Sequence, residues 1–166
     1  RGSDGGSSAP ADSVQLPSHN ERVSESPPRV RIVTLGCPKN DVDSEEIAGV
    51  LSGSGATIDA SSKDVDVVII NTCGFLESAK EESIRAIKDA VRERKAGRVK
   101  RVIVAGCLSQ RMGAEIERLA PGADRYVGVG QMARFSAIVE ATLAERKVIV
   151  ESEAPHHPWA DIGSRA

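Results

Sequence analysis

The stretch Val30–Glu46, VRIVTLGCPKNDVDSEE, decides how this chain folds. Its opening letters, VRIVTL, form a short apolar run rich in β-branched residues, which is typical of a buried strand. Pro38 cannot donate to a sheet and disfavours helical geometry at Cys37, so the strand is predicted to end there. A helix should follow, with Asn40 or Asp41 as its N-cap. The sequence therefore places Cys37 where a strand passes into the N-terminus of a helix.

The same succession of strand, turn and helix repeats along the chain. Strong apolar strands are predicted at 65–71 and 99–105, a further strand at 125–129, and a weak edge strand at 56–60. Helices with one apolar face lie between them, and Ser109 is the expected N-cap of the helix after the strand at 99–105. This alternation predicts an α/β fold: a flavodoxin- or Rossmann-like parallel sheet of about five strands, ordered 2-1-3-4-5, with helices on both faces.

The length of 166 residues allows one such domain with flanking tails. Residues 1–28 are rich in Ser, Gly and Pro and are predicted to form a disordered tail, whose start at Arg1–Ser3 resembles a tag remnant. The α/β domain is expected to span 29–150. Residues 151–166 show no periodicity and are interpreted as a linker.

The overall composition excludes several functional classes. Hydrophobic residues make up 40% of the chain, enough for one core, and the net charge of −2 argues against direct nucleic-acid binding. There is no apolar run of about 18 residues and no signal-peptide pattern. We therefore expect a cytoplasmic protein that makes no contact with a membrane.

Three cysteines each follow a predicted strand: Cys37 in VTLGC, Cys73 in IINTC and Cys107 in VIVAGC. In the predicted order these three strands are neighbours, and parallel strands end at one edge of a sheet. Strands lie roughly 4.8 Å apart, so the three strand ends span only about 10 Å. Helix N-termini at that edge favour thiolate, the form of cysteine that binds metal.

The residues alone leave three interpretations of these cysteines open. They could be buried core thiols, because free cysteine behaves as a small hydrophobic residue. They could bind zinc, although zinc usually takes four ligands with paired spacing and no fourth ligand is evident. They could hold an iron–sulfur cluster, which tolerates scattered cysteines and with three ligands keeps one iron open.

The motifs around the three cysteines resemble those of a known protein family. LGCPKN at 35–40, followed by VDSE at 42–45, resembles the N-terminal signature of the radical-SAM methylthiotransferases, and NTC at 71–73 and AGC at 105–107 resemble that family's second and third cysteine motifs. The resemblance runs over about residues 29–150. The Cys-Pro-Lys-Asn form resembles the RimO branch, which modifies an aspartate of the twelfth protein of the small ribosomal subunit. The tRNA-modifying branch typically has Cys-Gln-Met-Asn there.

This resemblance implies that Cys37, Cys73 and Cys107 hold an auxiliary 4Fe–4S cluster involved in supplying sulfur. The sequence has no C-x3-C-x2-C motif, so S-adenosyl-L-methionine (SAM) and a second 4Fe–4S cluster are expected in an absent radical-SAM domain. The fragment should be inactive alone and contain no catalytic residue, with a ribosomal protein and a sulfur donor as partners of the full enzyme. The alternatives are the N-terminal domain of a tRNA adenosine methylthiotransferase and a non-catalytic module that binds a metal, a nucleotide or a protein.

Three weaker signals have simpler interpretations. The GVGQMA sequence at 128–133 fits a dinucleotide fingerprint, but it follows a late strand, so turn chemistry explains it better. His156 and His157 lie between prolines in the terminal segment and are interpreted as part of a solvated linker. Lys39 and the acids after it are attributed to helix capping and the helix dipole rather than to a partner.

Overall fold

The computed structural model describes residues 26–144 and the backbone of residues 149–150. Its strands are β1 (Arg29–Thr34), β2 (Thr57–Ile58), β3 (Val65–Thr72), β4 (Val99–Gly106), β5 (Arg125–Val127) and β6 (Ile149–Val150). Its helices are α1 (Pro38–Gly53), α2 (Glu77–Lys95), α3 (Cys107–Leu119) and α4 (Phe135–Ala144), with a 3-10 helix, η1 (Val129–Arg134), before α4. The predicted alternation of strands and helices is confirmed.

Two predicted segments fall largely outside this description. The N-terminal tail lies outside the described residues except for its last few positions, and the linker with His156 and His157 lies outside them entirely. The domain boundaries therefore stay predictions. No helix in the described ranges is long and apolar enough to cross a membrane.

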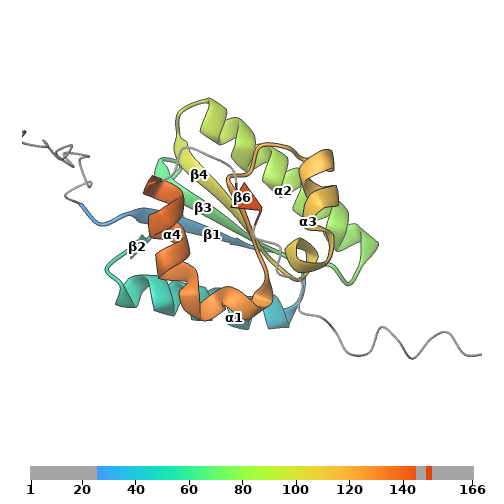
Figure 1. Cartoon of the computed structure of the whole chain (residues 1–166), viewed down its shortest axis with the longest axis horizontal. Coiled ribbons are helices and arrows are strands. Elements are labelled where there is room, and N and C mark those ends of the chain that lie inside the picture. Colours follow the sequence, from blue (N-terminus) through green and yellow to red (C-terminus); the bar gives the residue numbers. More distant parts are fainter. Residues whose placement is uncertain (1–25, 145–148, 151–166) are drawn as a thin grey trace, which may run out of the picture.

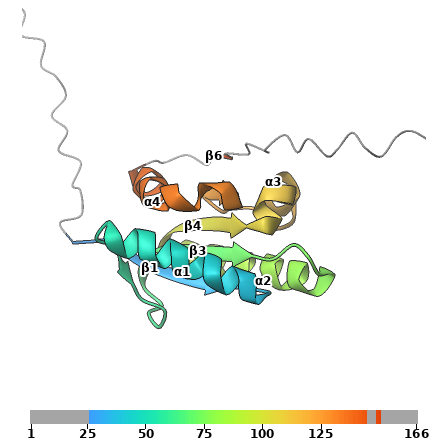
Figure 2. The same ribbon diagram turned by 90° about the horizontal axis from the view of Figure 1, so that it is seen from below.

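The strands form one parallel sheet in the order β2-β1-β3-β4-β5-β6. The predicted order 2-1-3-4-5 is confirmed, and the two-residue strand β6 extends the sheet beside β5. Figure 2 shows the arrowheads of β1, β3 and β4 pointing to the same end, where α1, α2 and α3 begin. The strand order reverses between β1 and β3, which is the position where sheets of this type bind ligands.

Two apolar cores cover the two faces of the sheet. Helices α2 and α3 pack on one face, and α1 and α4 pack on the other (Figure 1). In β3, Val68 and Ile70 belong to the first core and Ile69 to the second, as expected for side chains that alternate along a strand. Because both faces are buried, the central strands are continuous apolar runs, as in parallel sheets generally.

Helix α1 begins earlier than predicted. Its N-cap is Cys37 and its first residue is Pro38, so the prediction of Asn40 or Asp41 as N-cap is wrong. The fixed φ of proline suits the first helical position, where no N–H partner is required. The Asn40 side chain instead donates to the Leu35 carbonyl at 2.6 Å, across the turn that carries the cysteine.

Helix α3 also begins earlier than predicted. It starts at Cys107 with Gly106 as its N-cap, so the prediction of Ser109 is wrong. The Ser109 hydroxyl lies 3.3 Å from the Val104 carbonyl, to which it donates a long hydrogen bond back into β4. Both corrections move a cysteine into the beginning of its helix.

The GVGQMA segment forms η1 rather than the start of a long helix. Two of its N–H groups are paired within the protein: Val129 N–H donates to Gln110 Oε1 in α3 at 3.1 Å, and Gln131 N–H donates to the Gly128 carbonyl at 3.2 Å. These contacts agree with the interpretation of the segment as a turn.

Candidate metal centre

The three cysteines all follow the carboxyl ends of neighbouring strands. Cys37 lies after β1 as the N-cap of α1, Cys73 comes directly after β3, and Cys107 comes directly after β4. The register aligns Thr34 with Asn71 and Asn71 with Ala105, so the carboxyl ends of the three strands lie side by side. The structure therefore brings all three predicted site residues to one edge of the sheet.

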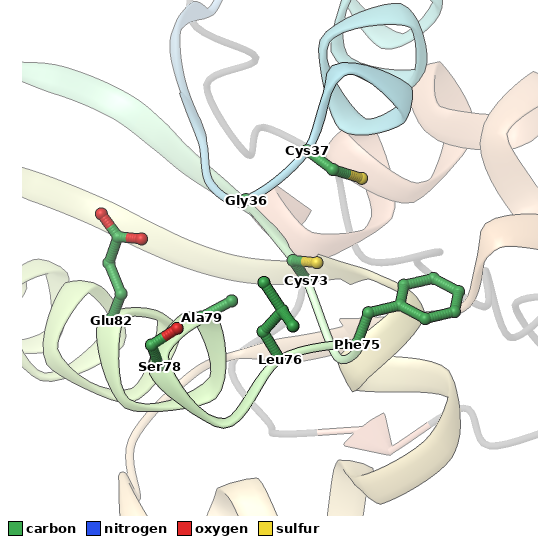
Figure 3. Close-up of a pocket in the computed structure, with 8 residues that line it drawn as sticks. All are labelled: Gly36, Cys37, Cys73, Phe75, Leu76, Ser78, Ala79 and Glu82. Carbon is green, nitrogen blue, oxygen red and sulfur yellow. The ribbon is translucent and has the colours of Figure 1, made fainter.

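A glycine allows the first two cysteine turns to approach each other. Gly36 has φ of +98°, and a Cβ added there would lie 2.2 Å from Cys73 Cβ and 2.8 Å from Cys73 Sγ. Any other residue at position 36 would both strain the backbone and collide with Cys73. Figure 3 shows the side chains of Cys37 and Cys73 pointing to the same side, with that of Cys73 buried.

A second glycine does the same for the third cysteine turn. Gly106 has φ of +98°, and a Cβ there would lie 2.4 Å from the Thr72 carbonyl oxygen and 2.6 Å from Asn71 Oδ1. The Cys107 turn is therefore packed against the end of β3. Sequence reasoning did not single out either glycine, although each directly precedes a cysteine, in VTLGC and VIVAGC.

The backbone around Cys37 favours its thiolate. The N–H groups of Asn40 and Lys39, at the start of α1, hydrogen-bond to the thiol and lower its pKa from the ordinary value, burial opposes them, and the Cys73 side chain lowers the pKa further. Donors at a helix N-terminus stabilise a negative sulfur for the same reason that they bind anions. Cys37 is thus prepared to act as a thiolate ligand.

The pKa of the Cys107 thiol is raised, in contrast to that of Cys37. Burial raises the pKa of its thiol, the nearby Lys39 ammonium lowers it, and the charges of Asp43, Cys73 and Cys37 raise it. The Lys39 side chain is paired with Asp43 at 2.9 Å, and this hydrogen bond raises its own pKa. The thiols of Cys37 and Cys107 and the Lys39 ammonium therefore share one electrostatic environment.

A polar network that sequence reasoning missed lies beneath the cysteines. The Asn71 side-chain amide donates to the Asn40 carbonyl and to Ser44 Oγ, both at 3.0 Å, and Thr34 Oγ1 donates to Ser44 Oγ at 2.8 Å. Asn71, Asn40 and Ser44 are all buried. Asn71 stood in the quoted NTC motif, and an asparagine at the end of an otherwise apolar strand was the available signal.

A pocket of about 300 Å³ opens beside Cys37 and Cys73. It is lined by Gly36, Cys37, Cys73, Phe75, Leu76, Ser78, Ala79 and Glu82 (Figure 3). Phe75 and Leu76 are 72% and 66% exposed, which is unusual for side chains of this size. An apolar rim therefore adjoins the thiols.

The donor set suits soft metals. The three thiols are free, and thiolates select zinc, copper(I) or iron–sulfur clusters. In the described part of the chain, no three His, Cys, Asp or Glu side chains are grouped closely enough to surround one ion. In a 4Fe–4S cluster each cysteine binds a different iron, so ligands spread over three turns fit a cluster in their chemistry and placement.

Comparison with known proteins agrees with these features. A model of the protein family described as "Uncharacterized protein family UPF0004" matches residues 29–128. The ribosomal protein uS12 methylthiotransferase RimO of Anaeromyxobacter sp. strain Fw109-5 is 41% identical over 128 residues, covering 77% of this chain and 27% of the relative. The protein of the same name from Pelotomaculum thermopropionicum is 44% identical over 122 residues, covering 74% of this chain and 28% of the relative.

A third relative extends the match. The RimO protein of Koribacter versatilis is 37% identical over 144 residues, covering 87% of this chain and 27% of the relative. The chain thus spans about a quarter of the length of the curated relatives it matches. The predicted resemblance to the N-terminal domain of the RimO branch is confirmed, and, with more than half of its residues matched by the family model, the chain belongs to the protein family UPF0004.

Proposed function

We propose that this chain is the part of a uS12 methylthiotransferase that holds an auxiliary 4Fe–4S cluster, with Cys37, Cys73 and Cys107 as its three ligands. One observation carries the proposal: three free thiols follow three neighbouring strands at the edge where such sheets bind ligands. The motifs around them and the names of the relatives support the same function.

The residues of this chain would hold and shield the group. When bound, the cluster would supply an iron that no cysteine occupies, at which sulfur can be held for transfer. The N–H donors at the start of α1 would keep Cys37 ionised, and the Lys39 ammonium would offset part of the negative charge of three thiolates. The pocket beside Cys37 and Cys73, rimmed by Phe75 and Leu76, would give access to the site from one side.

The remaining chemistry belongs to the rest of the parent protein. SAM and a second 4Fe–4S cluster would act there, on an aspartate of ribosomal protein uS12, with sulfur from a separate donor. This part would contain no catalytic residue and would be inactive alone. It would bind neither nucleic acid nor a membrane, and a ribosomal-protein substrate implies that the parent acts in the cytoplasm.

Anaerobic reconstitution of the 166-residue chain with ferrous iron and sulfide tests the cluster proposal. The expected result is a broad visible absorbance band together with about four irons per chain, as a 4Fe–4S cluster requires. Binding of a single Zn²⁺ with no band after iron and sulfide would support the zinc alternative. A chain that binds neither metal would support the non-catalytic module.

Mass spectrometry on a strain that lacks the parent gene tests the substrate. Loss of the parent should remove about 46 Da from ribosomal protein uS12, the mass of a methylthio group that replaces hydrogen. If uS12 is unchanged and a methylthio group disappears from tRNA, the parent belongs to the tRNA-modifying branch, and the cluster proposal is judged by reconstitution alone.

A further inference from the structure

Asn71 is a fully buried polar residue at the end of β3, between two neighbouring strands. It lies two positions before Cys73. A buried amide is costly unless its hydrogen bonds are made, because both its N–H groups and its oxygen lose contact with water. The partners of Asn71 therefore indicate what the residue does.

The amide nitrogen of Asn71 holds the turn that carries Cys37. It donates to the Asn40 carbonyl and to Ser44 Oγ, both in α1 and both at 3.0 Å. Asn40 in turn closes the cysteine turn, since its own N–H donates to the Cys37 carbonyl at 2.8 Å. The main chain adds a third link, from Leu35 N–H to the Asn71 carbonyl at 3.1 Å.

The amide oxygen of Asn71 faces the turn that carries Cys107. A Cβ on Gly106 would lie 2.6 Å from Asn71 Oδ1, so the two groups are in close contact. This oxygen is buried and has no hydrogen-bond partner among the described residues. A buried acceptor without a partner destabilises a fold, so stability alone does not explain why this oxygen lies against a candidate ligand turn.

We propose that Asn71 is a positioning residue that ties the three cysteine turns together and sets the geometry in which they bind metal. It holds the Cys37 turn through its nitrogen, precedes Cys73 in the same strand, and contacts the Cys107 turn through its oxygen. The inference rests on the proposed function, because it assigns Asn71 a role toward the three proposed ligands. Loss of this link should loosen the ligand set even where the fold survives.

Asn71→Asp separates positioning from simple packing. The aspartate has nearly the same shape and keeps the oxygen that faces Gly106, but as a carboxylate it only accepts hydrogen bonds and lacks the two donors to α1. Thr142→Val is the matched control: Thr142 is also buried, its hydroxyl donates to the Ile138 carbonyl at 2.6 Å, and its own carbonyl accepts from Arg101, a residue in the first half of β4. Both variants lose buried donors, but only the first loses them beside the cysteines.

The experiment compares reconstituted wild-type chain with the two variants by chelator challenge and by electron paramagnetic resonance of the reduced cluster. Asn71→Asp should retain iron about 10- to 100-fold less tightly, as is typical when a residue that orients metal ligands is replaced. Its resonance spectrum should also shift, and the spectrum and iron retention of Thr142→Val should match those of the wild type. A folded Asn71→Asp variant with wild-type retention and spectrum would overturn the proposal.

Two further arms keep the test decisive. If Asn71→Asp fails to fold, Ser44→Ala removes one of the two acceptors and should weaken iron retention by a smaller factor; unchanged retention would overturn the proposal. If the wild-type chain assembles no cluster, the proposed function fails, and phenylarsine oxide, which bonds two adjacent thiols with release of water, tests positioning without iron. The wild-type chain should react with phenylarsine oxide faster than Asn71→Asp does. Equal reaction rates would overturn the inference.

Discussion

The two edges of the sheet are built from different chemistry. The amino edge is closed by ion pairs: Lys100 with Asp66 at 2.6 Å, Arg94 with Asp124 at 2.6 Å, and a contact between Arg31 and Glu93. The carboxyl edge contains three thiols with the Lys39–Asp43 pair near them, a network of neutral amides and hydroxyls, and exposed apolar side chains. The same strands reach both edges, so the difference lies in the side chains at each end of the strands and in the segments that flank them.

This difference suggests that the amino edge stabilises the fold and the carboxyl edge binds the ligand. Charged pairs at the amino edge fix the ends of strands and helices without chemical reactivity. At the carboxyl edge the helix N-termini already supply positive potential, and neutral amides shape the turns without cancelling it. An anionic group built from thiolates would therefore find its favourable environment at the carboxyl edge only. Substitutions at the two edges should accordingly change different measured quantities.

The largest expected effect is loss of metal at the carboxyl edge. Cys37→Ala, Cys73→Ala and Cys107→Ala should each lose most of the reconstituted iron, because a three-ligand site has no spare ligand. His156→Ala, which removes another ligand type from this chain, should load as the wild type does. Iron content and visible absorbance after anaerobic reconstitution measure the result. A cysteine variant with full iron content would remove that residue from the ligand set.

The next largest effect is a loss of stability at Gly106, and a comparison with Gly97 separates the contribution of close packing from that of backbone strain. Gly106→Ala places a methyl group 2.4 Å from a backbone oxygen, at φ of +98°. Strain and overpacking together should destabilise the fold by about 3 to 5 kcal/mol. Gly97→Ala also has positive φ, +78°, but nothing lies within 4 Å, so it should cost only about 1 to 2 kcal/mol. Urea unfolding measures both, and equal losses would show that close packing at Gly106 is unimportant.

Sequence patterns were sufficient for the sheet and for the convergence of the cysteines. Apolar runs such as that of β3 can only be buried on both faces, and a parallel sheet then brings every strand end to one edge. The family motif at 35–40 added the expected role of the cysteines.

The details of the site were not predictable because they depend on contacts between distant segments. Asn40 was expected to cap α1 with its side chain, but that side chain bonds Leu35 across the turn, and its backbone carbonyl accepts from Asn71. No local pattern indicates that Gly106 would touch Thr72, which lies in another strand. The exposure of Phe75 was likewise invisible, since an isolated aromatic in a sequence is normally assigned to a core.

A smaller effect should come from the amino edge and leave the metal unaffected. Asp124 accepts from the Val102 N–H at 2.8 Å and pairs with Arg94, so Asp124→Ala should lower the free energy of unfolding by about 2 kcal/mol. Asp89→Ala removes a pair with Arg92 in which both side chains are mostly exposed, and should change stability by less than about 0.5 kcal/mol. Reconstituted iron should equal that of the wild type in both variants. Iron loss in Asp124→Ala with the fold intact would contradict the division between the edges.

The smallest effect is a pH dependence at the amino edge. The Arg29 side chain and then the N–H of Ser62 lower the pKa of Asp59 to about 2. Because the folded pKa lies below the usual value of about 3.9, the unfolded chain takes up the proton first as the pH falls. The stabilisation is therefore complete above about pH 4 and is lost between about pH 4 and pH 2.

Asp59→Asn should remove that part of the acid sensitivity. The urea midpoint of the variant should fall less between pH 6 and pH 3 than that of the metal-free wild type, in assays that differ only in buffer. Asp66 should contribute in the same direction: burial opposes the shift, but the Arg29 N–H and Lys100 lower its pKa. Asp59→Asn combined with Asp66→Asn should then flatten the dependence further. If the urea midpoint of the double variant falls with pH as much as that of the wild type, other titratable groups determine the loss of stability in acid. The ion pairs of Asp59 and Asp66 would then not contribute to it.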